Sequence, residues 1–221
     1  MQAQDPFEPS KILPPEAAPL EAFPPEETPA EPPKKSLLRG LLSFLWEVVQ
    51  TLALAGVLYL GINALTARVR VEGFSMYPTF KSGEFVLVYR LAYRTSPPHR
   101  GDIVVFQPQA FPSLASKNHQ DDYIKRVIGL PGEEVAVRDG HVYIDGHLIV
   151  EPYIAEPPHY SGVWKVPPGE VFVLGDNRNN STDSHFFGPV SLEQMVGRAV
   201  LVYWPPRAWR VLHDPQYPAS P

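Results

Sequence analysis

The hydrophobic positions first single out one long uncharged run near the N-terminal side of the chain. From Val48 to Ala67 there are 20 residues without a charge, bounded by Glu47 and Arg68. At a helical rise of about 1.5 Å per residue, such a run reaches roughly 30 Å, the thickness of a bilayer's hydrocarbon core. A buried core helix is the alternative, and a cleaved signal peptide fits less well because the run is long and many residues precede it. We expect one membrane-spanning helix within residues 36–67.

After Arg70 the pattern changes to short apolar runs separated by Gly and Pro, which is typical of β-strands. Asp139-Gly140 and Asp145-Gly146 separate successive runs and indicate tight hairpin turns. No segment there keeps a helical period, so residues 68–210 are expected to form a mainly β domain, an antiparallel sheet or barrel. Strands are expected at residues 85–89, 103–106, 123–128, 135–137, 141–144, 147–150, 171–174 and 196–203, and a short helical turn at 192–195.

The two ends of the chain are expected to be tails. Residues 1–33 contain ten prolines and seven acidic residues against one lysine, Lys11. Such a segment buries too little apolar surface to offset its ordering entropy, so residues 1–35 are predicted to be disordered. Residues 211–221 are expected to form a short C-terminal tail.

Charge and cysteine content exclude several classes of function. Residues 68–221 carry 15 basic and 16 acidic residues, so the folded part has no basic excess and nucleic acid is a poor candidate partner. The chain has no cysteine, which excludes disulfides, thiol nucleophiles and thiolate metal sites. The seven histidines show no metal-ligand spacing, and neither a metal nor another cofactor is expected. Basic residues on both sides of the apolar run slightly favour a cytoplasmic N-terminus (Lys34, Lys35 and Arg39 before it, Arg68 and Arg70 after it).

Ser75 lies in the stretch VEGFSMYPTF, soon after the apolar run. It has no GxSxG motif around it and no histidine within twenty residues. One interpretation is an ordinary turn hydroxyl ahead of Pro78. The other is a nucleophile that is activated by a base other than histidine, on a turn that Gly73 and Pro78 keep rigid.

Lys125 lies in the apolar run YIKRVI. Strand alternation places it on one face with Tyr123 and Val127. If that face is buried, desolvation lowers the lysine pKa from about 10.4 by as much as 3–5 units and produces an amine that can act as a general base. The alternative is a lysine at a sheet edge with its ammonium in water.

A third stretch, GDNRNNSTDSHFFGPV at residues 175–190, is rich in Asp, Asn and Ser. It does not fit a calcium loop, because Arg178 and Ser181 stand where an oxygen ligand and a glycine are required if Asp176 is the first position. A polar turn held by side-chain-to-backbone hydrogen bonds remains, and it is compatible with support of a catalytic site.

An apolar run is followed in order by Ser-Met-X-Pro-Thr, Gly-Asp before a strand, Lys-Arg-Val-Ile-Gly-X-Pro-Gly, and Gly-Asp-Asn-Arg-X-X-Ser-X-Asp-Ser. Over about residues 40–203 this arrangement closely resembles the bacterial type I signal peptidases. The resemblance implies a mainly β catalytic domain outside the cytoplasm and a Ser/Lys dyad, with Ser75 as the nucleophile and Lys125 as the general base. By motif position, the resemblance also assigns supporting roles to Ser181, which would orient the lysine amine, and to Asp183, Arg126 and Asp176.

Two positions depart from the family pattern. Gly73 stands where some members carry a serine whose hydroxyl helps to bind the oxyanion, so backbone donors or water are expected to replace it. His185 stands where the last motif usually has arginine, and we expect Arg126 or Arg178 to provide part of the bracing of Asp183 instead.

The resemblance implies a single-pass endopeptidase of the cytoplasmic membrane, with its N-terminus in the cytoplasm. It would cleave signal peptides from secreted preproteins after small residues of the Ala-X-Ala type. Its expected partners are those preproteins and the phospholipid membrane, near the secretion translocon, with the protein as a monomer. The candidates that would line the substrate pockets are Phe74, Met76, Tyr123 and Ile124.

Three alternatives compete with this interpretation. Self-cleaving repressors use the same chemistry but carry a DNA-binding domain where this chain has an apolar run. A specialised peptidase that matures one secreted substrate, such as a pilin, shares every motif. A membrane-anchored β domain that only binds would keep its function without Ser75 and Lys125.

Overall fold

A computed structural model of the chain describes residues 37–107, 122–215 and 217. The tail predicted to be disordered, residues 1–35, lies outside the described residues. The chain divides into two units, residues 1–49 and 50–221, with the boundary inside the first helix.

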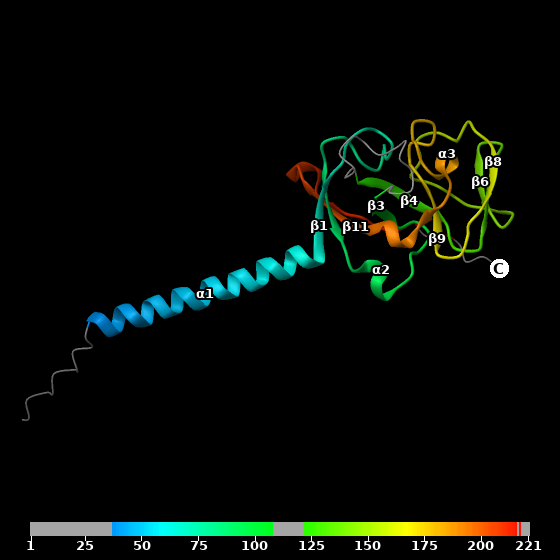
Figure 1. Cartoon of the computed structure of the whole chain (residues 1–221). Coiled ribbons are helices and arrows are strands. Elements are labelled where there is room, and N and C mark those ends of the chain that lie inside the picture. The colour runs from blue at the N-terminus through cyan, green and yellow to red at the C-terminus, as the bar shows by residue number, and fades with distance from the viewer. Residues whose placement is uncertain (1–36, 108–121, 216, 218–221) are drawn as a thin grey trace, which may run out of the picture. The chain divides into compact units, whose positions relative to one another are not determined.

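Helix α1 (Leu37–Leu65) is the long helix of Figure 1. Between Arg39 and Leu65 it is long and apolar enough to cross a membrane, and it is the one such helix in the part of the chain that the structure describes. None of the side chains in its most apolar stretch is buried, which disfavours a core helix. The helix ends at Leu65 rather than at residue 67, because Thr66 already begins a strand.

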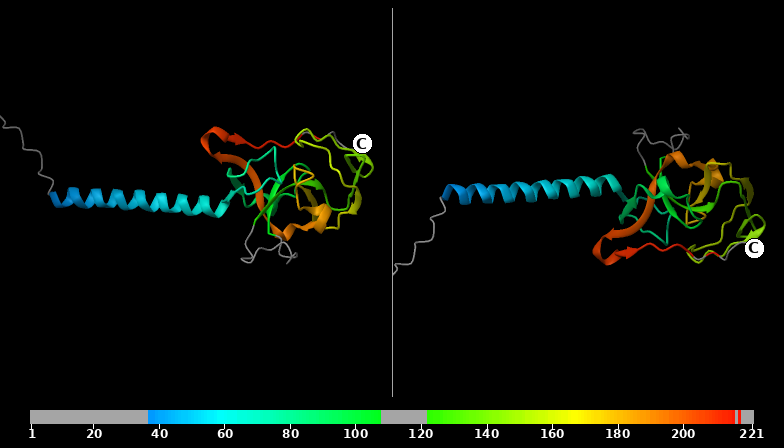
Figure 2. Two further views of the ribbon diagram at one scale, coloured as in Figure 1. Left: turned by 90° about the horizontal axis from the view of Figure 1, so that it is seen from above. Right: turned by 90° about the horizontal axis from the view of Figure 1, so that it is seen from below.

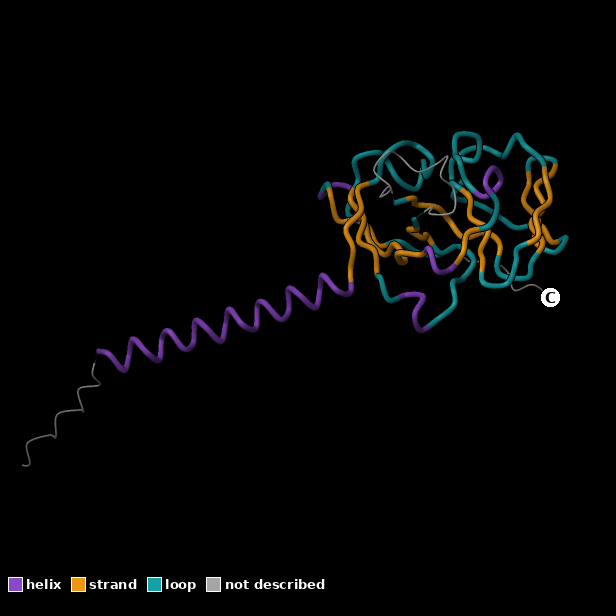
Figure 3. Tube along the Cα trace, viewed as in Figure 1, coloured by secondary structure: helices purple, strands orange, loops and turns teal. Residues whose placement is uncertain are grey.

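Of the two sheets within the described residues, the larger is antiparallel throughout. Figure 1 labels several of its strands, and Figure 3 draws the strands in orange. Most of its strands lie where the alternating runs predicted them. The strand order begins with β1 (Thr66–Arg70), β2 (Phe85–Tyr89), β11 (Met195–Trp204) and β3 (Ile103–Phe106), and continues with β4 (Tyr123–Gly129), β9 (Glu170–Leu174) and β10 (Val190–Ser191), while β12 (Arg210–Val211) pairs with β11.

A smaller sheet contains the predicted hairpins. Its order is β7 (His147–Leu148), β6 (His141–Ile144), β5 (Glu134–Arg138) and β8 (Gly162–Lys165). The hairpin turns are tight, and Asp139 and Asp145 both have positive φ angles. The remaining elements are two short helices, α2 (Ala92–Thr95) and α3 (Ser184–Phe187), and two 3₁₀ turns, η1 (Leu192–Gln194) and η2 (Pro206–Ala208). The prediction of a mainly β domain is confirmed.

Strand β4 runs through the centre of the core. It pairs with β3 on one side and β9 on the other, so it is an interior strand. Its side chains enter three apolar clusters, represented by Ile124, Val127 and Ile128. Lys125 is therefore held among buried neighbours, and the alternative of a lysine at a sheet edge is wrong.

The C-terminal segment beyond β12 is not a free tail in its described part. Leu212 packs against the apolar cluster beneath β2 and β11. In both views of Figure 2 the red segment leaves β12 and runs along the β domain towards the small sheet.

Candidate active site

Ser75 and Lys125 meet at the edge of the core. Ser75 lies in the turn after Val71, whose backbone N–H donates to the Glu84 carbonyl and continues the pairing of β1 with β2. The Nζ of Lys125 is 2.8 Å from the Oγ of Ser75 and 3.1 Å from the carbonyl oxygen of Ile124. The structure therefore brings together the two residues that the motifs predicted to react.

Burial changes the chemistry of Lys125. Lys125 is only 3% exposed to solvent. Desolvation lowers its pKa from 10.5 to about 8, although the negative charges of Asp183 and Asp176 act in the opposite direction. A lysine with such a pKa is partly neutral near pH 8 and can accept a proton from a hydrogen-bonded hydroxyl.

The last motif holds the backbone of the serine turn. The Asn177 backbone N–H donates to the Ser75 carbonyl at 3.0 Å, and its side-chain amide donates to the Phe74 carbonyl at 3.1 Å. Gly175 allows this approach, because a Cβ there would lie 2.5 Å from the Ser75 carbonyl oxygen. Asn177 lies in the polar stretch at residues 175–190, but nothing in its pattern indicated that this residue holds the serine turn.

Ser181 does not form the hydrogen bond that the resemblance implied. Its buried Oγ has no hydrogen-bond partner within the described residues. This Oγ lies so close to Gly175 that a Cβ added to the glycine would be only 2.2 Å from it. The described hydrogen bonds of the Lys125 amine go to Ser75 and Ile124 instead.

Asp183 is braced by histidine, not by arginine. The buried carboxylate accepts hydrogen bonds from the Gly175 backbone N–H at 2.8 Å and from the His185 ring Nδ1 at 2.6 Å. The His185 ring also stacks on Tyr160, with ring centroids 4.0 Å apart. The expectation that Arg126 or Arg178 would brace Asp183 is wrong, because His185 is close enough to take that place.

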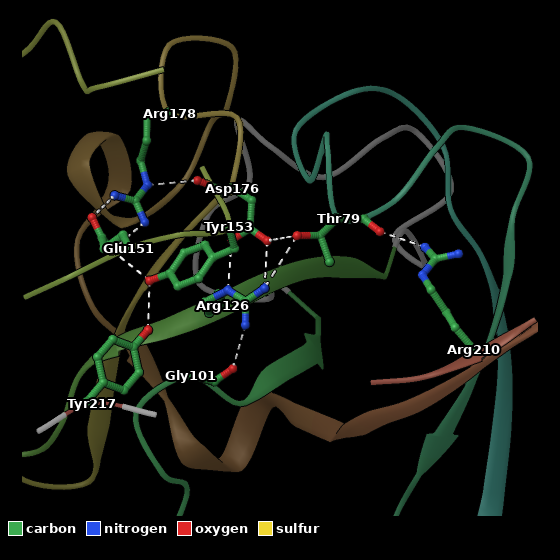
Figure 4. Close-up of polar contacts among 10 residues, drawn as sticks. Thr79, Gly101, Arg126, Glu151, Tyr153, Asp176, Arg178, Arg210 and Tyr217 are labelled. Carbon is green, nitrogen blue, oxygen red and sulfur yellow. Dashed lines mark hydrogen bonds and ion pairs between the residues drawn. The ribbon is translucent and has the colours of Figure 1, made fainter. Parts of the chain in front are cut away.

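The two arginines form separate buried ion pairs (Figure 4). Arg126 donates to Asp176 through Nε at 2.8 Å and Nη2 at 2.7 Å. Arg178 donates to Glu151, with its Nη2 at 2.7 Å. Asp176 also accepts a hydrogen bond from the Thr79 hydroxyl, so it joins β4 to the end of the serine turn. Glu151 belongs to none of the motifs, and no signal in the sequence marked it.

A groove of about 470 Å³ opens beside Ser75 and Lys125. Tyr123 and Ile124 are among its lining residues, whereas Met76 is 1% exposed and belongs to the core. Phe74 is exposed and is not among the residues that line the groove. Besides Ser75 and Lys125, the lining residues come from β1 and the segment after it, and from the start of β4 (Val69, Arg70, Glu72, Asp122, Tyr123, Ile124).

Comparison with known families supplies the remaining observation. The family model described as signal peptidase, peptidase S26, matches residues 44–204. The chain belongs to the S26 signal peptidase family. Ser75, Lys125 and the residues that brace them all lie inside the matched region.

Relatives within the S26 family are similar over most of their length. A signal peptidase I of Leptolyngbya laminosa is 42% identical over 190 residues, which cover 85% of this chain and 91% of the relative. A probable signal peptidase I-2 of Synechocystis sp. is 44% identical over 171 residues, which cover 76% and 78%. A solved signal peptidase I from Enterococcus faecalis V583 is 34% identical and covers 47% of this chain and 97% of its own, with a TM-score of 0.39. As a member of this family, the chain is a peptidase.

Proposed function

We propose that this protein is a membrane-anchored serine endopeptidase that removes signal peptides from preproteins after small residues, in the Ala-X-Ala pattern. One observation carries the proposal. The Lys125 amine lies 2.8 Å from the Ser75 hydroxyl, and burial lowers its pKa to about 8. A nucleophile within hydrogen-bond reach of a base that can be neutral is the arrangement that acyl transfer requires.

In the proposed mechanism, neutral Lys125 accepts the proton of Ser75 while Oγ attacks the scissile carbonyl. The backbone N–H of Ser75 stabilises the resulting oxyanion. Collapse of the tetrahedral intermediate breaks the peptide bond, and Lys125 gives its proton to the leaving amine. Lys125 then accepts a proton from the water that attacks the acyl-enzyme, and it returns this proton to Oγ as the bond between Ser75 and the acid product breaks.

The groove would bind the substrate as an extended strand. One wall is β1 with the segment after it, and the other is the start of β4, so both walls lead towards the dyad. Val69 of β1 and Ile124 of β4 are aliphatic lining residues of the groove and would limit the size of the residues before the cut. This supports selection of small side chains at the first and third positions.

Helix α1 would anchor the enzyme in the cytoplasmic membrane, with the N-terminus in the cytoplasm and the β domain outside. Anchoring raises the effective concentration of a membrane-held substrate without a new contact. The proposed partners are preproteins near the secretion translocon, and the proposed working form is a monomer.

Because the chain lacks cysteine, Gln4→Cys and Val150→Cys each introduce one label site. In intact cells an impermeant maleimide should label the second variant and not the first, and the reverse result would invert the topology.

The direct test offers the detergent-solubilised full chain a preprotein whose signal peptide ends in Ala-X-Ala. Cleavage after the last alanine is expected, and it should be lost in Ser75→Ala and in Lys125→Met. Persistent cleavage in Lys125→Met would show that the dyad assignment is wrong. If both variants lost no biological function in cells, a domain that only binds would be favoured.

A further inference from the structure

The C-terminal segment is tied to the β domain at several points. Arg198 of β11 forms ion pairs with Asp214 and, at 3.0 Å, with the buried Asp102. Beyond it, Pro215 and Tyr217 pack on Gly101. A Cβ on Gly101 would lie 2.9 Å from Pro215 Cδ and 3.0 Å from Tyr217 Cε2. No other residue type would fit without a shift, so glycine permits the segment to dock here.

Tyr217 extends this contact to a buried polar network (Figure 4). Its hydroxyl lies 2.7 Å from the hydroxyl of Tyr153, which in turn donates to Glu151 at 2.7 Å. Because Tyr153 has one proton and gives it to Glu151, Tyr217 is the donor in the first bond. Burial raises the pKa of Tyr217 to about 12, so it keeps that proton across the neutral range.

Tyr217 reaches Arg126 by two routes. The Arg126 guanidinium lies over the Tyr153 ring, with its Cζ 4.0 Å from the ring centroid, a distance typical of cation–π contacts. The Gly101 carbonyl, on the residue against which Tyr217 packs, accepts a hydrogen bond from Arg126 Nη1 at 2.9 Å. The C-terminal segment therefore supports the Arg126 guanidinium in two ways. It holds the Tyr153 ring against one face of the guanidinium, and it packs on Gly101, whose carbonyl accepts from Nη1.

Arg126 is in turn connected to both reactive residues. It follows Lys125 on β4 and binds Asp176 through two nitrogens. Asp176 accepts from Thr79 in the serine turn, and the next residue, Asn177, holds the Ser75 carbonyl. The Arg126–Asp176 pair thus sets the position of the serine turn relative to the strand that carries the lysine.

We propose that Tyr217 is a positioning residue for catalysis. By holding Tyr153 and Gly101 against Arg126, it aligns the Ser75 hydroxyl with the Lys125 amine, and the C-terminal segment completes the active site. This inference rests on the proposed Ser75/Lys125 mechanism. Since displacement of a reacting group by about 1 Å can cost ~10² in rate, partial loosening by loss of Tyr217 is expected to lower kcat about tenfold.

Three variants of the full-length protein in detergent test the proposal with a preprotein ending in Ala-X-Ala. Tyr217→Ala should lower kcat about tenfold with KM within about twofold, because the groove itself is unchanged. Tyr217→Phe keeps the ring on Gly101 and should recover kcat to within about threefold of wild type. His213→Ala removes an exposed side chain from the same segment and should match wild type. Equal kcat in Tyr217→Ala and His213→Ala would overturn the proposal.

Hydrogen exchange provides a readout that does not depend on activity. In Tyr217→Ala the amides of residues 74–80 and 175–178 should exchange faster, while those of the small sheet, residues 134–148, should not change. Unchanged exchange in the serine turn would overturn the proposal, as would uniform acceleration over the whole domain, which indicates general destabilisation. If the wild-type chain cleaves no preprotein, the proposed function fails, and the exchange result still decides whether Tyr217 orders the serine turn.

Discussion

The backbone N–H of Asn177 donates a hydrogen bond to the carbonyl oxygen of Ser75 at 3.0 Å. Ser75 is therefore fixed from two sides, by this donor on its backbone and by the Lys125 amine on its hydroxyl. The polar loop after β9 thus acts directly on the serine turn, although the two segments are far apart in sequence.

Replacement of Asn177 by aspartate tests the side-chain half of this clamp. Aspartate has the same shape but cannot donate to the Phe74 carbonyl, and its charge opposes that oxygen. We expect kcat to fall about tenfold with the fold intact, since a displaced nucleophile loses its near-attack geometry. Asn179→Asp is the matched control, because Asn179 also donates to a carbonyl, that of Pro157, but away from the dyad. Equal losses in the two variants would assign the effect to the loop as a whole.

The pKa of Lys125 predicts the pH dependence of cleavage. Burial lowers this pKa to about 8, and only the neutral amine can accept the Ser75 proton. A plot of kcat/KM against pH between 6 and 10 should rise with a midpoint near pH 8 and then level off. A midpoint near 6.5, where an unperturbed histidine titrates, would point to a base other than Lys125.

The same pKa shift predicts a pH-dependent stability. Between pH 8 and 10.5 the unfolded chain still holds the Lys125 proton while the folded chain has released it, so the free energy of unfolding rises with pH in this window. Relative to Lys125→Met, whose side chain does not titrate, the wild type should gain about 3 kcal/mol between pH 8 and 10.5. Urea denaturation at three pH values measures this difference. A constant difference would mean that the lysine is not desolvated in the folded state.

His185 is expected to contribute stability through Asp183. His185→Phe keeps a ring on Tyr160 but removes the Nδ1 partner of a fully buried carboxylate. The free energy of unfolding should fall by about 1–3 kcal/mol, as when a buried acceptor loses a donor. His141→Phe is the control, since the His141 ring lies 2.7 Å from a backbone carbonyl at an exposed site. If both variants unfold at the same urea concentration, the Asp183–His185 pair is not a brace.

Gly73 offers a test of how the oxyanion is held. Its φ angle is +81°, so any side chain there is strained, yet a Cβ would meet no atom within 4 Å. Gly73→Ser and Gly73→Ala should both fold, each with a loss of about 1–2 kcal/mol from the left-handed backbone. Because we expect backbone donors to hold the oxyanion, the added hydroxyl should make no difference, and the two variants should have the same kcat. A clearly higher kcat for the serine variant would show that a hydroxyl there adds a missing donor.

Much of this structure could be predicted from local patterns. A long uncharged run can satisfy its backbone only as a helix in lipid, and α1 follows from it. Alternation in FVLVY places Val86 and Val88 inside, and the Asp-Gly pairs fix the small-sheet hairpins. The motif order was sufficient to pair Ser75 with Lys125, because those motifs are specific to one family.

Tertiary structure alone decided which charged groups pair. The sequence could not show that Asp183 takes His185, that Arg178 takes Glu151, or that Met76 turns into the core. Nor could it show that Tyr217, in a segment expected to be a tail, lies against Gly101 beneath the Arg126–Asp176 pair. Local pattern sets which face of a strand is buried, but partners far apart in sequence are chosen by distances that exist only after the sheets have packed.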